Sequence, residues 1–133
     1  MTELIKKLLG LNTLLSIGLV YTLFITTAFV LPASEIPKVQ FVHINDKVVH
    51  VLIHFILSFI WMTYFFIFNK RKINYKNILI IILLCVFYGI IIEIIQQLLI
   101  ASRHADIFDI LANTTGSLLG ALVFWNVKNR IKT

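Results

Sequence analysis

The fold of this chain is decided by residues 78–100, which read ILIIILLCVFYGIIIEIIQQLLI. A helix needs about 20 predominantly apolar residues to cross the hydrocarbon core of a bilayer. This run meets that length, and Glu93 is its single charged residue. It therefore predicts a membrane-spanning helix that carries a small polar group close to one end.

Three further apolar runs occupy most of the remaining chain. With 133 residues, 59% of them hydrophobic and 14% charged, the chain has no room for a soluble catalytic domain. We predict an all-α membrane protein, a bundle of four transmembrane helices in a single membrane domain over residues 1–133. The predicted spans are residues 11–31, 48–68, 78–100 and 107–125.

The first run follows two basic residues and superficially resembles a secretory signal. Its apolar part is longer than the 7–15 residues of such a signal, and the sequence after it is a poor cleavage site. We therefore expect an uncleaved first span. Pro32 and Pro37 end this helix and favour an extended or turned linker over residues 32–47. Cys85 lies inside the third run, so we expect a structural thiol.

The net charge of +6 is carried by short basic clusters at the ends of the spans. Because the basic residues do not form one continuous surface, we expect no nucleic-acid partner. Lys and Arg are enriched in the cytoplasmic loops of membrane proteins. Cytoplasmic termini leave nine basic residues inside and only Lys38, Lys47 and Arg103 outside. We predict a multi-pass protein of the cytoplasmic (inner) membrane with both termini in the cytoplasm.

Polar residues recur along one face of the second span, at spacings of three and four residues. Such spacings place side chains on the same side of a helix, and here the other sides are apolar. We expect this polar face to point into the bundle, toward the outer leaflet. For His54 alone, a structural contact with a neighbouring helix is the favoured role. The face consists of Lys47, His50, His54, Ser58 and Trp61, and Asp46 opens the span.

The third span places Glu93 several residues inside its apolar run. A carboxylate there must be neutral, or paired with Lys47, Arg103 or a histidine, because an isolated charge is costly in hydrocarbon. A structural ion pair and a functional group are both open. The expected inward face consists of Gly89, Glu93, Gln96 and Gln97.

The fourth span repeats the pattern. Asp106, near the helix start, is suited to the positive end of the helix dipole. Gly116 and Gly120 form a GxxxG pattern, which lets two helices approach closely. We expect the partner to be another helix of this chain, and a homo-oligomer stays open. The expected inward face consists of Asp106, Asp109, Asn113, Gly116 and Gly120.

Two histidines four residues apart could in principle ligate a metal. His50 and His54, with Glu93 and Asp109, offer nitrogen and oxygen ligands that suit a transition ion. No HExxH sequence, phosphate-binding glycine loop or CxxC pair accompanies them. We therefore expect no metal and no cofactor, and name these four side chains as the ones that would ligate an ion.

In this order, these residues resemble the VanZ-like family of small bacterial polytopic membrane proteins. The resemblance covers about residues 40–120 and implies a link to resistance against the glycopeptide teicoplanin, without an assigned catalytic residue. His54 stands where the family more usually has an aromatic residue, so a role that needs two histidines would be particular to this chain. The residues that carry the resemblance are Asp46, Lys47, His50, Tyr88, Gly89, Glu93, Gln96, Arg103, Asp109, Asn113, Gly116 and Gly120.

We expect a cavity at the outer leaflet that engages a lipid head group or a lipidated small molecule. Lys47 and Arg103 would contact anionic groups, while Glu93, Asp109 and Asn113 would hold the cavity together. The first alternative is a membrane enzyme acting on an envelope lipid through His50, Glu93 or Asp109. The second is a proton or solute pathway, which the apolar inner halves of the spans disfavour.

Overall fold

The computed structural model describes residues 10–31, 45–100 and 104–131, and its regular elements are four long helices. These are α2 (Leu11–Val30), α3 (Asp46–Phe68), α4 (Tyr75–Leu99) and α5 (Ile107–Ile131). All four are long and apolar enough to cross a membrane. The predicted helical membrane architecture is confirmed, and the fourth helix extends six residues beyond the predicted end at residue 125.

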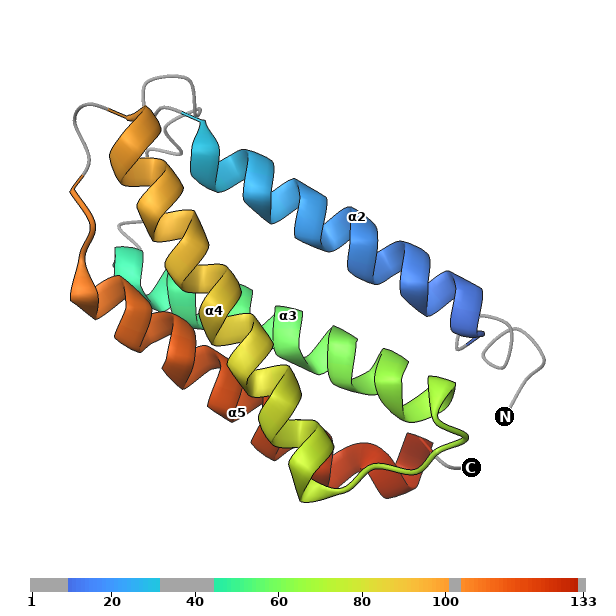
Figure 1. Cartoon of the computed structure of the whole chain (residues 1–133). Coiled ribbons are helices and arrows are strands. Elements are labelled where there is room, and N and C mark those ends of the chain that lie inside the picture. The colour runs from blue at the N-terminus through green and yellow to red at the C-terminus, as the bar shows by residue number, and fades with distance from the viewer. Residues whose placement is uncertain (1–9, 32–44, 101–103, 132–133) are drawn as a thin grey trace.

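Successive helices run in opposite directions, so α3 and α5 are parallel to each other (Figure 1). The first residues of α3 and α5 therefore lie at one end of the bundle, which we call the polar end. The first residues of α2 and α4 and the last turn of α5 lie at the opposite end. This arrangement matters for the site, because the polar residues of the second and fourth spans both stand near the helix starts.

The outer surface of the bundle is apolar, as expected for helices in contact with lipid. Val20, Leu23 and Phe24 project from α2, and Leu98 is 77% exposed on α4. Lipid tails solvate these side chains, so their burial cannot drive association of the helices. Cohesion must come instead from close packing and from polar contacts between helices.

The closest packing joins α3 to α5 and uses the glycines of the GxxxG pattern. A Cβ atom on Gly116 would overlap the backbone carbonyl of Val51, and one on Gly120 would overlap the Ser58 hydroxyl. The absence of side chains at these two positions lets the helix backbones approach. The expected partner of the pattern, another helix of this chain, is confirmed.

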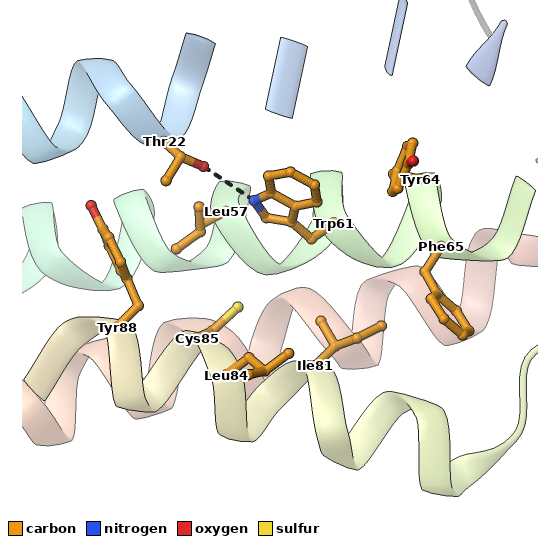
Figure 2. Close-up of a pocket in the computed structure, with 9 residues that line it drawn as sticks. All are labelled: Thr22, Leu57, Trp61, Tyr64, Phe65, Ile81, Leu84, Cys85 and Tyr88. Atoms are coloured by element: carbon orange, nitrogen blue, oxygen red, sulfur yellow. Dashed lines mark hydrogen bonds between the residues drawn. The ribbon is translucent and has the colours of Figure 1, made fainter. Parts of the chain in front are cut away.

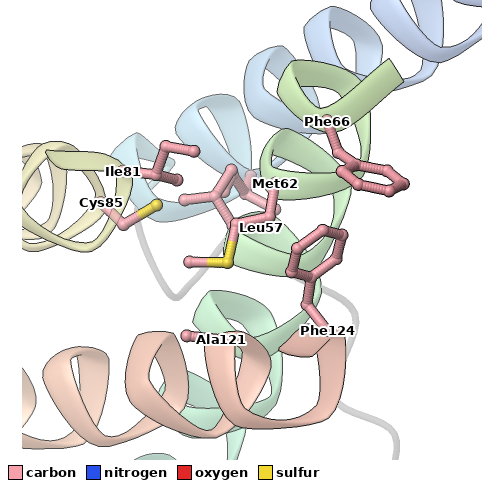
Figure 3. Close-up of a cluster of buried hydrophobic side chains, with 8 residues drawn as sticks. Leu57, Met62, Phe66, Ile81, Cys85, Ala121 and Phe124 are labelled. Carbon is pink, nitrogen blue, oxygen red and sulfur yellow. The ribbon is translucent and has the colours of Figure 1, made fainter. Parts of the chain in front are cut away.

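An apolar core fills the half of the bundle away from the polar end. Phe66 of α3 and Phe124 of α5 meet edge to face, with ring centroids 5.7 Å apart. Met62 lies beside them, and Ile81 and Cys85 complete the cluster from α4 (Figure 3). Cys85 is buried, consistent with the expected structural thiol.

Helix α2 is attached to α3 and α4 by hydrogen bonds as well as apolar contacts. The Tyr21 hydroxyl donates to the Ile53 carbonyl at 2.9 Å, and the hydroxyls of Thr26 and Tyr88 are 2.7 Å apart. A backbone carbonyl of α3 is thus engaged by a side chain of α2. Such bonds position α2 in an apolar environment, where apolar contacts by themselves give little specificity.

Candidate functional site

Six polar side chains from the starts of α3 and α5 lie together at the polar end. Parallel alignment of these helices brings their first turns side by side. Residues three and four apart in each helix lie on one face, and in both helices this face points toward the other helix. We call this group the polar cluster. It consists of Asp46, Lys47, His50, Asp106, Asp109 and Asn113.

Lys47 links the two helices through two carboxylates. Its ammonium donates to Asp106 Oδ2 at 2.6 Å and makes a second, shorter contact with Asp109 Oδ1. Asp106 also accepts a hydrogen bond from the backbone N–H of Phe108 at 2.9 Å, which caps the start of α5. The Lys47 ammonium, followed by the Phe108 N–H, lowers the pKa of the Asp106 carboxyl below its ordinary value.

His50 lies beneath this ion pair and is only 1% exposed. Its Nδ1 atom is 2.9 Å from Oδ1 of Asn113, and its ring stacks on Phe29 of α2 with centroids 5.0 Å apart. Because an amide oxygen can only accept, Nδ1 carries the proton in this pairing. Nε2 then points toward Asp46 Oδ2 and Asp109 Oδ2, each 3.8 Å away.

The polar cluster carries more negative than positive charge. Three carboxylates and one ammonium give a net charge of −2 when His50 is neutral. We expected Lys47 to contact anionic groups of a ligand, but its ammonium already has two carboxylate partners. The cluster is therefore better suited to a cation, an amine or a hydrogen-bond donor than to a phosphate.

The other predicted polar residues of α3 and α4 lie outside the polar cluster. His54 and Glu93 are 1% and 2% exposed, and Gln96 donates to the Phe29 carbonyl at 2.8 Å. The His54 ring approaches Tyr88, with centroids 6.1 Å apart, and its Nδ1 has no hydrogen-bond partner within the described ranges. Gln97 is exposed, so its predicted place on the inward face is wrong: it directly follows Gln96, and successive residues point in different directions around a helix.

Gly89 explains how α4 reaches these residues. A Cβ atom there would stand 2.8 Å from the Asn113 amide nitrogen and 3.1 Å from His54 Cε1. The glycine thus allows α4 to pack directly on the two polar side chains. Arg103, which we expected near the cluster, lies outside the described residues.

Two contributions were missed from the sequence. Asp106 was predicted on the inward face of the fourth span and at the helix dipole, but its ion pair with Lys47 was not predicted. Its three-residue spacing from Asp109 could have indicated a shared partner. Phe29 of α2 gives no sequence signal for its contact with His50, since any apolar residue suits a membrane span.

The metal-ligand geometry also differs from the expected set. In the part of the chain that the structure describes, Asp46, His50 and Asp109 have ligand atoms within 4.8 Å of one another. His54 and Glu93 do not belong to this group. Asp46 belongs to the group instead, and its side chain is 62% exposed.

A separate apolar pocket lies between α2, α3 and α4, nearer the middle of the bundle (Figure 2). Its volume is about 350 Å³, and its accessible lining is almost entirely apolar. Trp61 bridges the gap to α2 by donating from Nε1 to the Thr22 hydroxyl at 3.2 Å. The lining residues are Thr22, Leu57, Trp61, Tyr64, Phe65, Ile81, Leu84, Cys85 and Tyr88.

Comparison with known proteins agrees with this architecture. The sequence model of the VanZ/LLP1 family matches residues 12–128, from the first helix to the last. No curated protein and no solved structure matched the chain. Since the match covers all four helices together with the polar cluster, the chain belongs to the VanZ/LLP1 family.

Proposed function

We propose that this protein binds the acyl chain of a lipid or lipidated molecule in its apolar pocket, and that through such binding it contributes to teicoplanin resistance. The observation that carries the proposal is the pocket of about 350 Å³ between α2, α3 and α4. Small-molecule sites are typically about 300–1,000 Å³ and mainly apolar, with a few polar groups that fix orientation. Here the lining residues that carry polar groups are Thr22, Trp61, Tyr64 and Tyr88, and those of Thr22, Trp61 and Tyr88 are hydrogen-bonded within the protein.

The polar cluster stands in a suitable place for the polar part of such a ligand. At a rise of about 1.5 Å per residue, Leu57 at the pocket lies roughly 16 Å along α3 from Asp46. A molecule that occupies both places would need a tail at least that long, which fits a fatty-acyl chain. Tyr88 lies between the two regions, because it lines the pocket and contacts the His54 ring.

The distribution of basic residues supports an outward-facing polar end. Among the described residues, Lys47 stands at the polar end and the other basic side chains stand at the opposite end, where Lys128 lies 4.0 Å from the Trp125 ring centroid. Because Lys and Arg are enriched in cytoplasmic loops, this bias supports a cytoplasmic location for the opposite end. A lipidated antibiotic in the outer leaflet would then meet the polar cluster first. The basic residues of the opposite end are Lys70, Arg71, Lys72, Lys76, Lys128 and Arg130.

A membrane enzyme is the second candidate, and one observation favours it. Asn113 holds Nδ1 of His50 and leaves Nε2 directed at the mouth of the cluster, as a general base requires. In that case His50→Ala would cause one envelope lipid to accumulate. A proton pathway has less support, because the half of the bundle beyond the pocket is filled by the apolar core.

The experiment compares two variants of adjacent residues on α4. Leu84 lines the pocket and Leu83 does not, yet they are 61% and 57% exposed. Wild type, Leu84→Trp and Leu83→Trp are expressed at matched membrane levels in a sensitive Gram-positive host. We expect wild type and Leu83→Trp to raise the inhibitory concentration of teicoplanin but not of vancomycin, and Leu84→Trp to lose this effect.

Binding is measured in parallel on the purified proteins, with teicoplanin and its deacylated form as probes. The proposal requires binding that depends on the acyl chain and weakens in Leu84→Trp. Acyl-dependent binding without a change in susceptibility would refute the resistance role alone. Equal binding of both probes, or equal behaviour of the two variants, would refute the pocket as the binding site.

A further inference from the structure

We propose that Asp46, His50 and Asp109 form a binding site for a divalent transition-metal ion of the Zn²⁺ type. The ligands would be Oδ2 of each carboxylate and Nε2 of the imidazole. The site is independent of the apolar pocket, so it stands or falls separately from lipid binding.

The distances between the three atoms fit a shared ion better than direct hydrogen bonds. Nε2 of His50 is 3.8 Å from each carboxylate oxygen, which is too long for a hydrogen bond. Metal–nitrogen and metal–oxygen bonds to zinc are about 2.0–2.2 Å, so two ligands of one ion lie up to about 4.3 Å apart. The 3.8 Å separations therefore leave room for an ion between the ring and either oxygen. The exposed Asp46 side chain can adjust to complete the set.

The buried imidazole is already oriented as a ligand. Asn113 fixes the proton on Nδ1, so the lone pair on Nε2 faces two carboxylates. A lone pair and two carboxylate oxygens at close range repel one another, and a cation between His50 Nε2 and the two Oδ2 atoms would relieve that repulsion. Metal-binding histidines commonly have their second nitrogen held in this way by an oxygen acceptor.

The charges around the site are balanced by a divalent ion. Lys47 contacts Oδ1 of Asp109, which leaves Oδ2 of the same carboxylate directed toward His50. The polar cluster has a net charge of −2 with a neutral imidazole, and M²⁺ would bring it to zero. One imidazole and two carboxylates suit zinc and related ions, with a fourth position for water or a ligand group.

The test uses untagged full-length protein in lipid nanodiscs, stripped of metal and titrated with Zn²⁺ against a chromophoric chelator. Asp46→Asn removes one ligand from an exposed side chain and should leave the fold intact. Asp106→Asn is the matched control, because it makes the same chemical change in the same cluster at a residue outside the ligand set. Helical content by circular dichroism confirms that each variant is folded.

We expect wild type to bind one Zn²⁺ per chain and Asp46→Asn to bind at least about tenfold more weakly. Asp106→Asn should weaken binding by less than about fivefold, as expected for an exposed charge. Co²⁺ should give visible absorption bands typical of nitrogen and oxygen ligands in wild type and Asp106→Asn, and weaker bands in Asp46→Asn at the same Co²⁺ concentration. Failure of folded wild type to take up Zn²⁺, or equal affinities in the two variants, would overturn the proposal.

Discussion

Nδ1 of His50 in α3 lies 2.9 Å from Oδ1 of Asn113 in α5, and both side chains are almost completely buried. This bond joins the two helices that pack most closely, at the level where α4 also approaches through Gly89. It satisfies two polar groups that would otherwise face hydrocarbon. It also decides which nitrogen of His50 is directed toward the carboxylates, so packing and chemistry depend on the same contact.

Asn113→Ala should destabilise the folded protein by about 1–3 kcal/mol, because it leaves Nδ1 of His50 buried without a partner. The measurement is denaturant or thermal unfolding in detergent. Thr115→Ala is the control, since the Thr115 hydroxyl is exposed and bonds only to the Leu111 carbonyl of its own helix. A loss for Asn113→Ala no larger than that of the control would contradict the prediction.

Gly116→Ala should destabilise the bundle by about 1–3 kcal/mol through overpacking, because the added methyl overlaps the rigid Val51 carbonyl. Gly18→Ala makes the same chemical change against the Trp61 ring, whose nearest atom is 3.1 Å from the added Cβ. A side chain can move where a backbone cannot, so the loss should be smaller at Gly18. Equal losses in an unfolding assay would show that the α3–α5 contact is not unusually close.

Lys47→Met should reduce stability by about 1–3 kcal/mol, since it leaves the largely buried Asp109 carboxylate without its cation. The loss should be smaller than for a fully buried pair, because the Lys47 side chain is 37% exposed. The double variant Lys47→Met/Asp109→Leu should recover part of the stability that Lys47→Met loses, because it also removes the unpaired carboxylate. The coupling is measured as a double-mutant cycle on unfolding free energy. A double variant no more stable than Lys47→Met would argue against this ion pair.

The contribution of Asp106 should depend on pH in a defined direction. Its pKa is lowered in the folded protein by the Lys47 ammonium and the Phe108 N–H, so the ionised form is favoured by folding. That stabilisation is fully present above the unfolded pKa, about 3.9, and is lost as pH falls through the lower folded pKa. The stability difference between wild type and Asp106→Asn should therefore be constant near neutrality and shrink below about pH 4. A difference that is unchanged across this range would contradict the prediction.

The sequence alone determined the number of apolar spans and most of the inward-facing side of the second, third and fourth helices. Four apolar runs of membrane length predict four helices, because backbone groups in lipid must be satisfied within helices. The three- and four-residue spacings of His50, His54 and Ser58 likewise required a common face, and all three side chains are buried. Both inferences depend on local geometry, which a helix fixes by itself.

Only the tertiary structure decided which of these inward groups meet. The spacing of residues along the sequence would equally allow Lys47 to pair with Glu93, or His54 to ligate an ion together with His50. The parallel alignment and relative rotation of α3 and α5 instead bring Lys47 to Asp106 and Asp109, and His50 to Asn113. That alignment is set by contacts between distant segments, above all the close approach at Gly116 and Gly120. Periodicity within one helix carries no information about the rotation of its neighbour, so the partners could not be read from the sequence.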